Sequence, residues 1–280
     1  KLLESSNNYN MHVVKRFLWL PYTIYSGVLF TCLILLAFPI TLLTLLLPSR
    51  LQDIIMFWLL KIISNCWFLF SGILPINYHR KKINFNKSYL LLPNHQSYMD
   101  AAIIYTSIPH IFKSLEKKEI EKTPIYGVIY KSVVITVDRS SVHAKASSFR
   151  KMQAYLEKGC SILLFPEGTF PSKAQQDLMP FQNGGFALAI MQQVDILPIL
   201  FLDTANRLSP ANVLQLSPGV NRAVFLPVIS VHHLTSKDSE TLKEYTQLYM
   251  QTCLDFCKSH SPKHVWSFAL NYLQQQPFVT

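Results

Sequence analysis

The sequence predicts an α/β protein with a mixed, largely parallel sheet flanked by helices and preceded by an N-terminal membrane-embedded helical hairpin. Two observations lead to this fold class. From residue 88 onward, short apolar runs of strand length alternate with amphipathic stretches of helix length, which is the pattern of βαβ units. Before residue 79, two long apolar segments dominate the chain. We therefore expect a membrane-embedded segment at 1–78 and a globular domain at 79–280.

The first apolar segment, Phe17–Leu47, contains no charged residue, and it exceeds the roughly 20 residues that a helix needs to cross a bilayer. Pro48 is expected to end it. The second segment, Asp53–Leu74, is apolar except for a few polar residues. It either spans the membrane or lies in the interface with Lys61 snorkelling. The alternative is a helical pair packed on the domain.

Basic residues flank both ends of this hairpin. Lys15 and Arg16 precede the first segment, and three basic residues at 80–82 follow the second. If positive flanks mark the cytoplasmic side, a hairpin that enters and returns leaves the domain on the cytoplasmic side of the cell inner membrane.

The composition indicates what kind of surface the protein meets. Half of the 280 residues are hydrophobic, 15% are charged, and the net charge is +10. A basic protein favours an anionic partner, and no nucleic-acid-binding signature accompanies the charge. The phospholipid bilayer is therefore the expected partner, and nucleic acid is not.

The domain is expected to alternate strands with helices, the helices ending at Gly or Pro signals such as Gly159. The predicted strands are Ser88–Leu92, His110–Lys113, Val133–Val137, Ser161–Phe165, Ile196–Leu202 and Ala223–Val228. The predicted helices are Tyr98–Ser107, Ser141–Lys158, Gly185–Gln192, Ser239–His260 and Lys263–Gln276.

His95 and Asp100 follow the first of these strands, five positions apart. Within one α-helix that spacing would turn the two side chains away from each other, but a turn between them allows contact. An imidazole held by a carboxylate through one nitrogen keeps its other nitrogen as a base, which can deprotonate an alcohol. The alternative is structural, because Ser97 and Asp100 also have the spacing of a helix capping box.

Two further strand ends carry polar groups. Glu167 lies in the turn Phe165–Thr169, where its carboxylate could bind polyol hydroxyls, although a plain surface turn explains those residues equally well. Arg139 follows another strand and offers a guanidinium suited to phosphate. Parallel strands place such ends on one edge of the sheet.

In order and content these stretches resemble the glycerolipid acyltransferase family, which includes 1-acyl-sn-glycerol-3-phosphate acyltransferases. The four blocks that carry the resemblance are N-H-x-S-x-x-D at Asn94–Asp100, a strand ending in D-R at Gly127–Arg139, F-P-E-G-T at Phe165–Thr169, and an apolar run around Pro198 at Val194–Leu200. The similarity covers about residues 80 to 232, so the globular part is expected to be an acyltransferase domain.

The resemblance implies a role for each block. His95 would be the general base and Asp100 its orienting partner, Arg139 would bind the acceptor phosphate, and the turn residues Glu167, Gly168 and Thr169 would line the acceptor site. The implied reaction moves an acyl chain from acyl-CoA or acyl-carrier protein to the free hydroxyl of a lysophospholipid. That acceptor would be 1-acyl-sn-glycerol-3-phosphate and the product phosphatidic acid, with no cofactor and no metal.

Two positions depart from the family pattern. Phe170 stands where Arg is common, and Gln182-Asn183 replace a basic pair; Lys173 is expected to supply the missing charge. Another lysolipid acceptor therefore stays open as an alternative. So does a non-catalytic membrane lipid-binding protein, while a serine hydrolase is disfavoured because the chain has no G-x-S-x-G.

Overall fold

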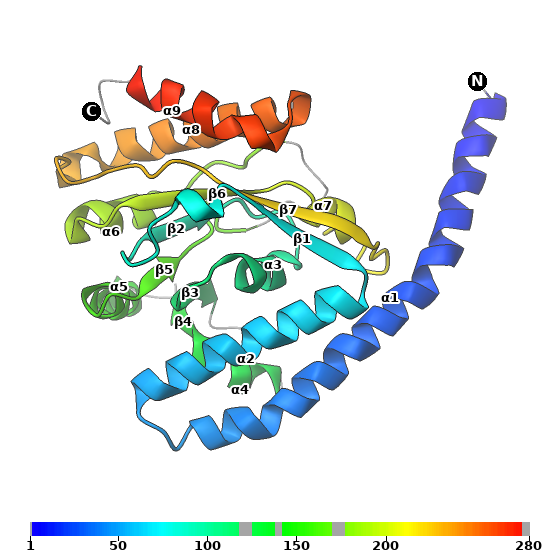
Figure 1. The fold of residues 1–280 in the computed structure, drawn as a ribbon, viewed down its shortest axis with the longest axis horizontal. Helices are drawn as coiled ribbons and strands as arrows, with labels where there is room; N and C mark the ends of the chain where they lie inside the picture. Colours follow the sequence, from blue (N-terminus) through cyan, green and yellow to red (C-terminus); the bar gives the residue numbers. More distant parts are fainter. Residues whose placement is uncertain (1, 118–124, 138–141, 170–176, 276–280) are drawn as a thin grey trace.

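The computed structural model describes residues 2–117, 125–137, 142–169 and 177–275, and its centre is a mixed sheet covered on both faces (Figure 1). Among the described residues the sheet has seven strands in the order β1-β7-β6-β2-β5-β3-β4. Neighbours are parallel except for the antiparallel pair β6–β7. The strands are β1 (Ile73–Tyr78), β2 (Leu90–Pro93), β3 (Phe112–Lys117), β4 (Val134–Val137), β5 (Ser161–Leu163), β6 (Ile196–Phe201) and β7 (Gly219–Phe225).

The central strand β2 shows why these runs are continuously apolar. Successive side chains of a strand point to opposite faces, and here Leu90 and Leu92 enter one hydrophobic core while Leu91 enters the other. All three are buried. A strand that is covered on both sides has no solvent face on which to alternate polar residues.

Each face of the sheet has its own helices. The first core is formed with α5 (Val142–Glu157), α6 (Gly184–Gln192) and α8 (Ser239–Ser259), and α9 (Val265–Gln274) packs on α8. On the other face lie α3 (Asp100–Ser107), the long helices α1 (Leu2–Thr44) and α2 (Ser49–Phe70), and α4 (Tyr126–Val133). The short α7 (Thr204–Arg207) connects β6 toward β7.

The α/β fold class with a mixed, largely parallel sheet is confirmed, and the predicted strands and helices all occur with shifted ends. The sequence missed α4, α7 and β1. The apolar pattern runs on from α2 into β1, and the break between them is the left-handed Gly72 (φ 60°). The expected domain boundary between residues 78 and 79 stays a prediction. The strand β1, which lies just before that boundary, belongs to the sheet.

In the described part of the chain, two helical stretches are long and apolar enough to cross a membrane, Trp19–Thr44 and Ser49–Phe70. They form an antiparallel pair along one side of the domain (Figure 1). Lys61, which is expected to snorkel, donates a hydrogen bond from its ammonium to the Ile108 carbonyl at 2.6 Å, just beyond the end of α3, and its position relative to a membrane stays a prediction. Near the start of α2, Asp53 pairs with the buried Lys113 of β3 at 2.6 Å. The two charged residues Asp53 and Lys61 of α2 thus bind the domain.

Candidate functional site

The carboxyl ends of β2 and β5 lie side by side because the two strands pair in parallel. The chain leaves β2 into the turn that carries His95, and it leaves β5 into the turn that carries Glu167. Two of the motifs that lie far apart in the sequence therefore meet at one edge of the sheet, where α/β folds place their ligand sites.

His95 and Asp100 are in contact. The imidazole Nδ1 lies 2.7 Å from Asp100 Oδ2, and the aspartate is fully buried. The same oxygen accepts the backbone N–H groups of Gln96 at 2.7 Å and Ser97 at 2.9 Å. A carboxylate acceptor favours the proton on Nδ1, so Nε2 is the nitrogen suited to receive a proton from a substrate.

Only one half of the expected capping box is present, because α3 begins after Met99 without a side-chain cap and the Asp100 N–H bonds the Ser97 carbonyl, not its hydroxyl. Asp100 accepts from the Ser97 N–H, and the Ser97 hydroxyl accepts from the Met99 N–H at 3.2 Å. The Ser97 hydroxyl also donates to the Leu208 carbonyl at 2.6 Å. One aspartate thus fixes the entry into α3 and orients the imidazole.

Asn94 fixes the turn from the other side. Its fully buried amide donates to the Phe201 carbonyl at 3.1 Å and accepts the Phe201 N–H at 2.6 Å. A side chain that bonds both groups of one residue extends the sheet pairing beyond the end of β2. His95 therefore leaves the sheet from a rigid support.

The ring of Phe165 stacks on the face of the His95 imidazole. The two ring centroids are 3.9 Å apart and the rings are 17° from parallel. Sequence reasoning identified Phe165 as the start of a motif but not as a neighbour of His95, because no local pattern reports a contact across seventy residues. With Asp100 at Nδ1 and Phe165 on its face, the ring has a fixed plane.

Glu167 is 5% exposed and joins two loops. Its Oε1 accepts the His95 N–H at 2.8 Å and its Oε2 accepts the Met179 N–H at 2.8 Å. Burial raises the pKa of this carboxyl to about 7, although both N–H donors act to lower it. These contacts suit a group that positions the His95 backbone; contact of Glu167 with substrate stays a prediction.

Glu167→Gln is expected to slow acyl transfer and to remove one part of the pH dependence of stability. Glutamine has one carbonyl oxygen, so its amino group would face one of the two N–H donors. Because folding raises the pKa from 4.5 to about 7, the protonated carboxyl favours the folded state. That contribution is complete below about pH 4.5 and is lost as the pH rises through about 7.

Denaturation in detergent from about pH 4 to about pH 8 measures the effect. The unfolding free energy of the wild type should fall relative to Glu167→Gln by roughly 3 kcal/mol at most. Glu240→Gln, on an exposed carboxylate of α8, serves as the control and should leave the pH dependence unchanged. A difference between wild type and Glu167→Gln that does not vary with pH would contradict this interpretation.

Two residues of the expected acceptor site cannot be placed in the structure. Arg139 and Lys173 lie outside the described residues, so their contacts with a phosphate stay predictions. Gly168 has a left-handed backbone (φ 70°), which requires glycine in this turn, and Thr169 beside it is exposed. Within the described ranges, no three His, Cys, Asp or Glu side chains gather as metal ligands; a reaction without metal or cofactor stays a prediction.

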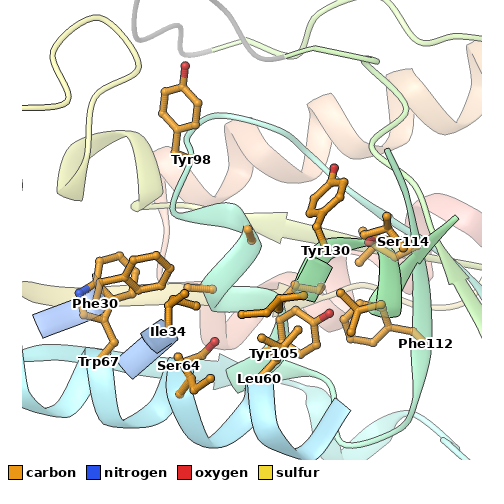
Figure 2. Close-up of a pocket in the computed structure, with 18 of the residues that line it drawn as sticks. Phe30, Ile34, Leu60, Ser64, Trp67, Tyr98, Tyr105, Phe112, Ser114 and Tyr130 are labelled. Carbon is orange, nitrogen blue, oxygen red and sulfur yellow. The ribbon is translucent and has the colours of Figure 1, made fainter. Parts of the chain in front are cut away.

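A cavity of about 380 Å³ lies between the hairpin and the sheet (Figure 2). Its walls come from α1, α2, α3, α4 and the strands β3, β4 and β5, and they are mostly apolar and aromatic. Phe165, the residue stacked on His95, lines it together with Tyr98. The labelled lining residues in Figure 2 are Phe30, Ile34, Leu60, Ser64, Trp67, Tyr98, Tyr105, Phe112, Ser114 and Tyr130.

Comparison with known proteins agrees with this site. The family model described as Acyltransferase matches residues 75–202, the part of the chain that contains all four motifs. Residues 75–202 of the chain thus match the Acyltransferase family.

Several curated proteins are similar to this chain in sequence. The chain is 30% identical to the 1-acyl-sn-glycerol-3-phosphate acyltransferase of Cocos nucifera, over 42% of this chain and 39% of that protein. It is 27% identical to 1-acyl-sn-glycerol-3-phosphate acyltransferase alpha of Mus musculus, over 59% of this chain and 58% of that one. An uncharacterized acyltransferase of Schizosaccharomyces pombe is 29% identical, over 60% of this chain and 61% of its own length. The chain thus spans about two fifths to three fifths of these relatives.

A solved structure supports the fold. The crystal structure of PlsC, the 1-acyl-sn-glycerophosphate acyltransferase of Thermotoga maritima, superposes with a TM-score of 0.71 and covers 88% of this chain and 98% of that one. The sequence identity is 18%. The likeness therefore extends to most of the chain as a similarity of fold.

Proposed function

We propose that the protein is a membrane-bound acyltransferase that moves an acyl chain from a thioester donor to the free hydroxyl of a lysophospholipid. One observation carries the proposal: a mostly apolar cavity is lined by Phe165, the residue stacked on the His95 imidazole. An oriented base beside an apolar cavity suits a reaction between a hydroxyl and an acyl chain. The relatives named 1-acyl-sn-glycerol-3-phosphate acyltransferases support 1-acyl-sn-glycerol-3-phosphate as the acceptor and phosphatidic acid as the product.

In the proposed reaction His95 Nε2 takes the proton of the acceptor hydroxyl while the hydroxyl oxygen attacks the thioester carbonyl. The Asp100 carboxylate, 2.7 Å from Nδ1, stabilises the imidazolium that forms. The tetrahedral intermediate then collapses, the carbon–sulfur bond breaks, and the imidazolium returns the proton to the departing thiolate. The products are an ester and a free thiol, so no covalent acyl-enzyme is needed.

We further propose that the α1–α2 hairpin lies within one leaflet and does not cross the bilayer. The contacts of α2 with the domain extend along the helix, from Asp53 with Lys113, through Lys61 with Ile108, to Phe68 in the second core. A helix bound to the domain over this length cannot traverse the membrane while the domain stays outside it. The basic flanks of the hairpin favour the cytoplasmic side.

Gly27 provides a test of the cavity as the acyl-chain site. It lies on α1 and lines the cavity, and a Cβ built on it has no neighbour within 4 Å. Gly27→Leu should fill that space and lower kcat/KM for long-chain acyl donors by about tenfold relative to short-chain donors, since overpacking costs about 1–3 kcal/mol.

The control for this test is Val28→Leu, one position along α1, where the side chain is exposed. It should leave the chain-length preference unchanged, and both variants are assayed with a series of acyl-CoA donors. An unaltered preference in Gly27→Leu would show that the acyl chain binds elsewhere.

A panel of lysolipid acceptors tests the proposed substrate. Purified protein is mixed with a labelled acyl thioester, as acyl-CoA or on acyl-carrier protein, and with lysolipids that differ in head group. We expect the highest kcat/KM with 1-acyl-sn-glycerol-3-phosphate. A higher value with a lysolipid that lacks a phosphate monoester would move the assignment to that acceptor.

A further inference from the structure

An exposed apolar surface continues from the hairpin onto the catalytic domain. The loop between α7 and β7 exposes Val213 and Leu214, each to about half. At one edge of the sheet, β1 exposes Leu74 and β7 exposes Val220, and these two residues are opposite each other in the β1–β7 register. The other exposed members of this surface are Ile24, Tyr25 and Val28 of α1 and Leu69 and Phe70 of α2.

Hydrogen bonds hold the loop to α1 at a fixed level. Thr23 Oγ1 accepts the Leu216 N–H at 3.0 Å, and its single hydroxyl proton is shared between the Trp19 carbonyl at 2.7 Å and the Leu214 carbonyl at 3.1 Å. Tyr25 donates to the Phe70 carbonyl at 3.1 Å, and the Gly219 N–H bonds the Gly72 carbonyl at 3.0 Å. Figure 1 shows the start of β7 beside α1 and the start of β1. The four segments form one surface.

The exposed apolar residues of this surface come from uncharged stretches of sequence, while Arg207, which precedes the loop, donates a hydrogen bond to the Pro218 carbonyl. The stretches 17–47, 62–78 and 208–221, which meet there, contain no Asp, Glu, Lys or Arg. Large contiguous apolar surfaces on proteins mark partner or membrane contacts. A bilayer fits this one best, because Thr23 lies inside the most hydropathic segment of the chain, Trp19–Thr44, and the loop is bonded to it at the same level.

We infer that the loop at 209–217, together with the Leu74–Val220 pair, is a second membrane contact that inserts beside α1. This inference rests on the proposed membrane location of the hairpin. It gives the domain two attachments to the lipid surface, which fix the orientation of the domain on the membrane, where a lysolipid and an acyl chain lie.

The test measures how the protein partitions onto phosphatidylcholine vesicles in a flotation assay. The double variant Val213→Asp/Leu214→Asp should lower the partition coefficient by about tenfold, because carboxylates resist transfer into the bilayer. The control Leu248→Asp alters an equally exposed leucine of α8 on the domain and should leave it unchanged. Leu36→Asp, on the exposed face of α1, reports on the hairpin itself.

The outcomes separate the two claims. If the loop variant floats like the wild type while Leu36→Asp does not, the loop inference is overturned and the hairpin contact stands. If neither variant loses binding, the membrane location in the proposed function fails as well. An equal loss in Leu248→Asp would also overturn the inference, because the effect would then not depend on the position of the charge.

A direct depth measurement covers the case in which the aspartates disturb the loop. A nitrobenzoxadiazole label is placed on Val213→Cys, with Leu248→Cys as control, after replacement of the exposed Cys32. We expect quenching of the Val213 label by spin-labelled lipid and of the Leu248 label by aqueous iodide. Iodide quenching at position 213 would overturn the inference.

Discussion

Replacing His95 with alanine is expected to lower kcat for acyl transfer by about 10²- to 10⁴-fold, the usual contribution of a general base. The structure gives the physical reason. The ring is held by Asp100 at Nδ1 and by Phe165 on its face, so the loss of the imidazole removes an oriented proton acceptor. The half-buried backbone around it keeps its hydrogen bond with Glu167, so the fold should persist.

The measurement is a steady-state assay in detergent–lipid micelles with the acceptor saturating. His264→Ala alters an exposed histidine before α9 and is the matched control, with kcat expected to match the wild type. Thermal melting of each variant separates lost chemistry from lost structure. A folded His95→Ala protein that turns over at the wild-type rate would exclude His95 as the base.

The second large effect is expected for Asp100→Asn. The substitution keeps the shape and an oxygen that can accept the Gln96, Ser97 and His95 hydrogen bonds now made by Oδ2. The new amide nitrogen can occupy the place of Oδ1, which is buried and has no hydrogen-bond partner among the described residues. The fold should therefore survive while the negative charge beside the imidazolium is lost, and we expect kcat to fall by about 10²- to 10⁴-fold.

Asp255→Asn on α8 is the control for loss of a carboxylate, since Asp255 is exposed on the surface. Its kcat should equal that of the wild type. The assay compares kcat and the melting temperature of the three proteins. If the Asp100→Asn protein melts several degrees lower but keeps full kcat, Asp100 stabilises the start of α3 and has no role in the chemistry.

The strand ends were the part of the site that could be predicted. The run Leu90–Leu92 and the pair Ile162 and Leu163 are apolar on both faces because helices cover both faces, and that pattern is visible in the sequence. Parallel pairing of β2 and β5 then brings His95 and Glu167 to one edge. The sequence also allowed both roles of Asp100, and the structure shows that one oxygen serves both contacts.

The supporting contacts were not predictable, since they join residues far apart in the chain. Asn94 bonds the main chain of Phe201, and Glu167 bonds the main chain of Met179, so neither partner has a side chain that could reveal the pairing. Lys61 is expected to snorkel from an apolar helix, and its hydrogen-bond partner is a carbonyl after α3. The cavity was not predictable either, because its walls combine residues from seven helices and strands.

The most direct test of the central claim is a comparison of acyl-CoA alone with acyl-CoA plus 1-acyl-sn-glycerol-3-phosphate, followed by intact-protein mass spectrometry and lipid analysis. Direct attack by an acceptor hydroxyl that His95 deprotonates predicts an unchanged protein mass with the donor alone, and phosphatidic acid when the acceptor is added. A gain of one acyl mass on the protein, or free fatty acid as the sole product with both substrates present, would contradict it.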